Sequence, residues 1–271
     1  MALTFQATKF MYDNISSDKF NIIICSFDGS SGISNAKEVS EITIDNGKVT
    51  GSDKWLKIKS NYSSPLSFTF NVCKKDCSEF SSIERRTMSA WLTSSHGGYK
   101  PMQFYSQEYC NIIFYAKCTT LEKNTVAGKV IGFQLTFTTN APYGFTPEKE
   151  LNINMTSSTQ TLNIMNSSDE VDVMLYPKLE ITILQNCNFS IKNNRVNRTF
   201  SISNCTSGEI IMVDQEVGYI NSSKRGSDII SAFNKVWFGL YCDMADMSNS
   251  VTINGKANVK IICSYPRKVG V

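Results

Sequence analysis

The sequence predicts a mainly β protein with one long helix. Apolar residues alternate with polar ones in many short segments, which is typical of strands that bury one face. The composition agrees: hydrophobic residues make up 41%, aromatic residues 11% and charged residues 19% of the 271, and Asn, Ser and Thr are abundant. One longer segment carries apolar residues at helical spacing instead. A chain of this length can bury a real core in one large domain or two smaller ones.

Two hairpins are expected at Asn-Gly pairs, because these residues accept the positive φ values of a tight turn. The first spans residues 41–50 and turns at Asn46-Gly47. The second spans residues 251–261 and turns at Asn254-Gly255. Further strands are expected at residues 20–27, 66–72, 112–119, 130–138, 151–155, 171–176, 179–184 and 208–213.

A helix is expected over residues 79–93. Ser81 with Glu84 three residues later forms a capping-box pattern, and Gly97-Gly98 lies beyond as a stop signal. The helix should pack on a sheet through the apolar residues that recur along it, namely Phe80, Ile83, Met88, Trp91 and Leu92.

A domain boundary is expected within residues 141–147. Pro142, Gly144 and Pro147 interrupt the strand pattern there, and strands resume at residue 151. The sequence therefore predicts a β-rich domain with the helix, residues 1–146, followed by an all-β domain, residues 147–271.

The charge balance argues against nucleic-acid and membrane partners. The formal net charge is +3, and this excess lies in residues 1–146. Sequence-specific nucleic-acid binding and anchoring to an acidic membrane normally need a stronger basic cluster. The first residues do not resemble a signal peptide and the longest apolar run is short, so folding in a cytosol is expected.

Nine cysteines are scattered along the chain. In a reducing cytosol they should be free thiols, mostly small buried hydrophobes on strands. Cys73 and Cys77 could form half of a zinc site, but a structural site needs four ligands and no second pair of this spacing follows. We therefore expect no metal, and a polar turn from a strand into the helix at 73–77. The full set is Cys25, Cys73, Cys77, Cys110, Cys118, Cys187, Cys205, Cys242 and Cys263.

No catalytic or cofactor-binding residues are predicted. The single histidine, His96, follows the helix without a nucleophile motif beside it, so a solvated or helix-capping role is expected. Acidic clusters at residues 169–172 and 243–246 lack the pattern of a calcium loop and should be solvated turns. Paired glycosidase carboxylates stay open, because their spacing is spatial. Residues 29–32 should form a plain loop, since no phosphate-binding fingerprint surrounds them.

The three tryptophans, Trp55, Trp91 and Trp237, each lie within an alternating or helical apolar pattern. Core packing is the expected role. A ligand-stacking role stays open for Trp237.

Several segments of the first half follow one another in a familiar order. Leu3-Thr4-Phe5 is followed by residues 17–22, by the helix ending at residues 90–92, and then by residues 99–104, 115–118, 133–137 and 141–143. This order resembles the distal tail proteins of long-tailed phages, with Asn21 in place of a glycine in the opening segment.

The second half resembles the same family. Residues 171–173 and 176–181 are similar to the entry of its C-terminal domain, and residues 198–202 and 208–214 follow in the family's order. Met247-Ser248-Asn249 replaces the usual Gly-x-Asn before the late hairpin.

The resemblance implies a fold and a function. The N-terminal part is expected to be a β-sandwich-like domain that builds a homohexameric ring, and the C-terminal part a galectin-like β-sandwich that projects outward. Such a ring joins the tail tube to the tail-associated lysin or to baseplate and receptor-binding proteins, and it leaves a lumen for DNA. The protein would assemble in the host cytoplasm, reside at the virion tail tip and catalyse no reaction.

Two other classes of function compete. A β-sandwich could be a carbohydrate-binding module for host-surface recognition, which requires polar groups around a sugar ring. A hydrolase would show turnover on cell-wall material.

Overall fold

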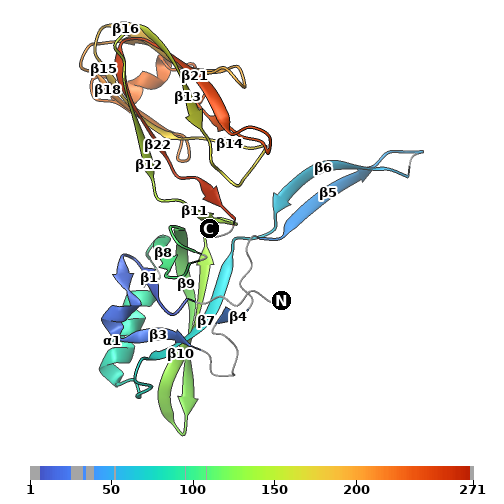
Figure 1. Ribbon diagram of the computed structural model, residues 1–271, viewed down its shortest axis with the longest axis vertical. Coiled ribbons are helices and arrows are strands. Elements are labelled where there is room, and N and C mark those ends of the chain that lie inside the picture. The colour runs from blue at the N-terminus through green and yellow to red at the C-terminus, as the bar shows by residue number, and fades with distance from the viewer. Residues whose placement is uncertain are drawn as a thin grey trace. The chain divides into compact units, whose positions relative to one another are not determined.

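The computed structural model describes residues 7–25, 33–34, 40–51, 53–94, 96–107 and 109–268. Leu3-Thr4-Phe5, the expected loop at 29–32 and the end of the expected strand 20–27 lie outside these ranges. The chain divides into two compact units, one of Met1–Thr146 with Arg267–Val271 and the other of Pro147–Pro266. Both are built mainly of strands (Figure 1), as the alternating sequence predicts.

The first unit contains an eight-stranded antiparallel sheet. Aromatic side chains from its strands form the core, and Phe68, Phe70 and Phe137 are each at most 1% exposed. A 3-10 helix, η1 (Ser17–Phe20), precedes β3. The strand order is β2 (Ile15–Ser16), β1 (Phe10–Tyr12), β8 (Lys100–Phe104), β9 (Phe114–Val126), β10 (Lys129–Thr139), β7 (Ser67–Lys74) and β3 (Ile22–Cys25), and β4 (Ile33–Ser34) also pairs with β7.

The helix α1 (Ser82–Leu92) begins three residues later than the sequence predicts. The expected capping box is confirmed, because the Ser81 hydroxyl accepts from the Glu84 amide and the Glu84 carboxylate accepts from the Ser81 amide. Met88 and Leu92 are buried. Ile83 is 76% exposed, so its expected place in the packed face is wrong. Five positions separate it from Met88, which turns it about 140° away around the helix.

The hairpin β5 (Ile42–Lys48) and β6 (Trp55–Tyr62) forms a two-stranded sheet of its own (Figure 1). The expected turn at Asn46-Gly47 is wrong, because β5 continues through both residues. Lys48 pairs with Trp55 at the end of the ladder, and the register shifts between Asp45 and Asn46. The Asn-Gly pair thus lies opposite a β-bulge, whose extra residue, Ile58, belongs to β6.

The second unit is a β-sandwich. Inward side chains of both sheets form one core, in which Ile181, Phe189, Phe200 and Ile253 are fully buried. One sheet has the order β12 (Lys149–Asn154), β22 (Ala257–Cys263), β15 (Lys178–Ile183), β18 (Ile210–Asp214) and β19 (Tyr219–Ser222), and the other has β13 (Thr159–Met165), β21 (Ser248–Asn254), β16 (Cys187–Asn193) and β17 (Arg198–Cys205).

Short elements complete the chain. The expected strand at 171–176 is reduced to β14 (Met174–Leu175). The remaining elements are β20 (Leu240–Tyr241), which pairs with β14, the 3-10 helix η2 (Ser227–Ser231), and the pair β11 (Gly144–Phe145) and β23 (Pro266–Arg267).

The expected hairpin at Asn254-Gly255 is wrong in its pairing. Gly255 has a φ of 101°, so the turn itself is present. However, β21 before it and β22 after it belong to different sheets of the sandwich. The chain therefore crosses from one layer to the other at this point.

A buried carboxylate lies near one end of the sandwich. Glu209 is 0% exposed and pairs with the Arg225 guanidinium at 2.8 Å. It also accepts hydrogen bonds from the Ser222 hydroxyl and from the Thr206 amide. These bonds join the turn between β17 and β18 to the turn after β19.

Candidate interaction surfaces

The β5–β6 hairpin exposes large apolar side chains on both of its faces. By the register of the two strands, Ile42 and Ile44 lie on one face together with Trp55, which pairs with Lys48. Leu56 pairs with Gly47 on the other face, and Ile58 also approaches Gly47. These five side chains are between 54% and 74% exposed, more than scattered surface residues present. An isolated two-stranded hairpin is marginally stable in water, so this hairpin is suited to cover by another surface.

Gly47 leaves room for Ile58 on the partner strand. A Cβ at this position would lie 2.9 Å from Ile58 Cδ1, so a larger residue would displace the isoleucine. Gly47 is thus explained by a close side-chain approach rather than by a turn.

Polar side chains accompany Leu56 on the Gly47 face of the hairpin, because Thr43 pairs with Asn61, and Asp45 pairs with Lys59, on this side of the ladder. Trp55 lies on the face of Ile42 and Ile44 and is 64% exposed. The expectation that Trp55 packs in a core is therefore wrong, because the alternation that surrounds it belongs to an exposed hairpin. Trp91 and Trp237 do pack against the cores of their units, as expected.

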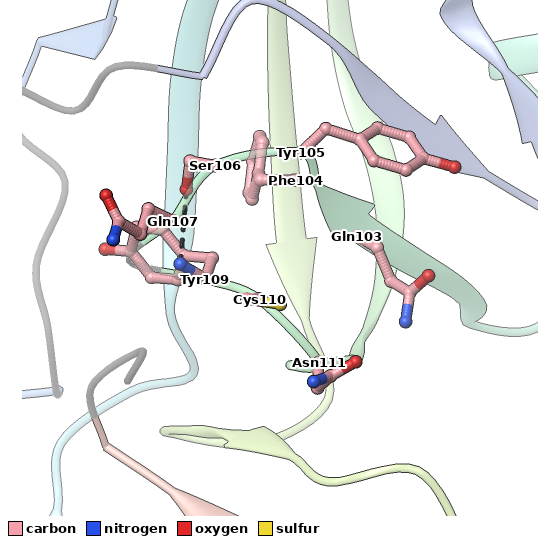
Figure 2. A pocket seen from close by; sticks show the side chains of 8 residues that line it. All are labelled: Gln103, Phe104, Tyr105, Ser106, Gln107, Tyr109, Cys110 and Asn111. Carbon is pink, nitrogen blue, oxygen red and sulfur yellow. Dashed lines mark hydrogen bonds between the residues drawn. The ribbon is translucent and has the colours of Figure 1, made fainter.

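A pocket of about 430 Å³ lies at the loop between β8 and β9 (Figure 2). Phe104 and Tyr109 belong to the buried core, and the Tyr109 amide donates to the Ser106 hydroxyl at 3.1 Å. Gln103 and Asn111 add amide groups to the lining. The described lining residues thus offer neutral hydrogen-bonding groups around an aromatic floor.

The two acidic clusters predicted as solvated turns meet around Tyr241. The Tyr241 hydroxyl donates to Asp172 at 3.0 Å, and this bond raises the pKa of the phenol. Arg195 pairs with Asp243 at 2.6 Å. Backbone amides of Asp246 and Ala245 and this guanidinium hold the pKa of Asp243 below its usual range. The carboxylates therefore fix loops, and the sequence alone showed no signal for Arg195 or Tyr241 as their partners.

The described residues offer no cluster of metal ligands, and His96 lies at the surface. In the described ranges no three His, Cys, Asp or Glu side chains lie close enough together to hold a metal ion. His96 is exposed beyond α1, and Thr93 occupies the C-cap position. The same ranges contain no helix with the length and apolar character needed to cross a membrane.

The nine cysteines are free, and five of them are buried. Burial raises the pKa of the Cys118 and Cys263 thiols to about 11, so both stay protonated at neutral pH. Cys73 is also buried, at the end of β7, and only Cys77 is exposed in the turn. The expectation that both lie in a polar turn is therefore wrong for Cys73.

Serine substitutions should separate these two cysteines. Cys77→Ser is expected to change the free energy of unfolding by less than about 0.5 kcal/mol, since the residue is exposed. Cys73→Ser should cost about 1–3 kcal/mol because it buries a hydroxyl in place of a thiol. Denaturant titration measures both. Stoichiometric zinc in the purified protein, lost together with the fold in the double variant, would contradict this account.

Two family models together match nearly the whole chain. The model of a phage tail protein N-terminal domain matches residues 5–141, and that of a phage tail C-terminal domain matches residues 143–263. The chain belongs to the phage tail proteins. No curated protein sequence matches this tail protein.

A solved structure shows the same fold. The Dit protein of phage SPP1, described as a paradigm of the hub adsorption apparatus in Gram-positive infecting phages, matches the tail protein with a TM-score of 0.69. The identity is 11%, over 95% of this chain and 98% of that one. A chain of the phage p2 baseplate in its activated conformation is 9% identical over 94% and 97%, with a TM-score of 0.47. The expected resemblance to distal tail proteins is thus confirmed.

Proposed function

We propose that this tail protein is a structural adaptor that assembles into a closed ring of about six copies at the tail tip. The first unit builds the ring, and the second, a galectin-like sandwich, projects outward. The ring joins the tail tube to the tail-associated lysin or to baseplate and receptor-binding proteins, and DNA passes through its lumen. The protein acts without catalysis and assembles in the host cytoplasm. The family match and the shared fold support this proposal.

The exposed apolar side chains of the β5–β6 hairpin are the observation that carries the self-association. Burying Ile42, Ile44, Leu56 and Ile58 should contribute on the order of 1–2 kcal/mol per side chain. A ring needs a contact in which one surface of each copy meets a different surface of its neighbour, and a hairpin with its own two-stranded sheet can supply one side of it. The near-neutral charge of the chain favours a protein partner over nucleic acid.

The double variant Ile44→Asp, Ile58→Asp tests the ring. Charged side chains at these exposed apolar positions should reduce the oligomer to a monomer, because their burial would leave unpaired carboxylates at the contact. The matched control is Thr43→Asp, Asn61→Asp, which adds the same charges at polar positions of the same hairpin. Light scattering after size exclusion and negative-stain imaging measure the assembly.

The wild-type protein and the control should show rings with the same mass. A wild-type protein that stays strictly monomeric at tens of micromolar, or a double variant that still forms rings, would contradict the proposal. Thermal unfolding should remain unchanged in both variants, since all four side chains lie outside the two cores.

A further inference from the structure

The outer face of the β13–β21–β16–β17 sheet is made almost entirely of hydroxyl and amide side chains. Inward residues such as Ile191, Phe200 and Val251 fill the core, so their neighbours along each strand point outward. Among the outward positions of these four described strands, one residue is charged, namely Lys192. The uncharged polar set comprises Thr159, Thr161, Asn163, Ser190, Thr199, Ser201, Ser203, Ser250, Thr252 and Asn254.

The opposite sheet differs in chemistry. Its outer face carries the ion pair Lys260–Glu150 and the exposed apolar residues Ile210 and Met212. An outer face of this sandwich can thus carry charged and apolar side chains. Solubility alone therefore does not explain why the first face is uncharged.

Hydrogen bonds order this uncharged face. The Thr161 and Thr252 hydroxyls lie 2.9 Å apart, and the Asn194 amide donates to Thr252 at 2.9 Å. The Asn254 amide donates to Ser190 at 3.3 Å. Hydroxyl and amide groups are thus held in fixed positions before any ligand arrives.

A groove of about 620 Å³ opens at the β16–β17 end of this face. The segment after η2 forms one wall, and Asn234 fixes it by accepting from the Ser201 amide and donating to the Thr199 carbonyl. The buried residues Phe189, Ile202 and Phe233 lie beneath the groove. The polar lining comes from Asn188, Ser190, Thr199, Ser201, Ser203 and Asn234.

Two hydroxyl groups in the groove are available to a ligand. In the part of the chain that the structure describes, the side chains of Thr199 and Ser201 make no hydrogen bond with protein groups. Both residues are half-buried and lie two positions apart on the same face of β17. Each hydroxyl can donate one hydrogen bond and accept two.

We propose that this groove binds a neutral saccharide. Sugar hydroxyls both donate and accept, so they match Ser, Thr and Asn side chains, and the volume lies within the range of about 300–1,000 Å³ typical of ligand sites. An anionic glycan or a nucleic acid would meet a single charged side chain, Lys192, among the described outward positions of these strands. The face therefore favours a neutral ligand. This activity goes beyond the adaptor role, to which it adds contact with a glycan surface.

The test uses the full chain and an array of neutral, sialylated and phosphorylated oligosaccharides, followed by a titration of the strongest neutral binder monitored by NMR. We expect binding of neutral members with a dissociation constant in the millimolar range. The variant Thr199→Val, Ser201→Ala should weaken it about ten-fold, because two neutral hydrogen bonds are lost. Thr182→Val, on the outer face of the other sheet, is the matched control and should bind as the wild type does.

Three outcomes would overturn the proposal. They are no binding of any neutral saccharide at millimolar concentration, binding confined to acidic members, and binding that the double variant retains in full. Light scattering on the same samples keeps the ring assignment separate, since the groove variants should assemble whether or not they bind sugar. Thermal unfolding should confirm that both variants are folded.

Discussion

Replacement of Trp91 by alanine should lower the free energy of unfolding of the first unit by about 3–5 kcal/mol. The indole stacks on Phe20 with ring centroids 4.5 Å apart and on Phe10 at 5.8 Å. Its N–H donates to the Tyr12 carbonyl at 3.1 Å. The substitution removes the stacking area and leaves that carbonyl without its indole donor, so both losses add to the cavity.

Two substitutions on the same helix serve as controls. Trp91→Phe keeps most of the ring stacking and loses the donor, which should cost about 1 kcal/mol for the hydrogen bond alone. Ile83→Ala removes a side chain that is 76% exposed and should change stability by less than about 0.5 kcal/mol. Urea titration measures all three. A Trp91→Ala loss below about 1 kcal/mol would mean that α1 does not pack as described.

Replacement of Glu209 by alanine should destabilise the second unit by about 3–5 kcal/mol. The carboxylate is buried and pairs with Arg225, so its removal leaves a partly buried guanidinium without this partner. The double variant Glu209→Ala, Arg225→Met removes both charges and should recover a large part of the loss. Equal destabilisation in the single and double variants would contradict this account.

The stability that the Glu209 carboxylate contributes should also depend on pH. Burial alone would raise the pKa of Glu209, but bonds from Ser222, Thr206 and Arg225 outweigh it and hold the pKa below its usual value. A carboxyl group with a lowered folded pKa stabilises the protein above its unfolded pKa of about 4.3, and the contribution is lost as the pH falls through the folded value. The difference in stability between the wild type and Glu209→Gln should therefore shrink below about pH 4.

Local patterns in the sequence predicted the elements better than their partners. The capping box at Ser81 and Glu84 was predicted correctly, because both signals act within one turn, although the predicted helix began three residues too early. Neither Asn-Gly pair forms the expected hairpin turn. Asn46-Gly47 continues β5 opposite a bulge, whereas Gly255 has a positive φ but links the two layers of the sandwich. Only pairing over long distances decides between such outcomes.

The candidate surfaces show the same division. Alternation around Trp55 predicted a strand correctly, but it cannot tell which face meets a core of the same chain and which meets another molecule. Glu209 and Arg225 lie in turns with no motif, and only the folded sandwich brings them together. The uncharged groove draws on β16, β17 and the segment after η2, so no single stretch of sequence reveals it.

The crossing at Asn254-Gly255 determines when the second unit can complete its fold during translation. The strands on either side of it, β21 and β22, occupy interior positions in the two sheets of the sandwich. Each pairs with a strand near the beginning of the unit, β13 and β12, about a hundred residues earlier. While the ribosome is still translating these codons, both layers lack an inner member and their neighbours expose open edges. The sandwich can therefore close only after residue 263 has emerged, and until then those edges stay open to pairing with other strands.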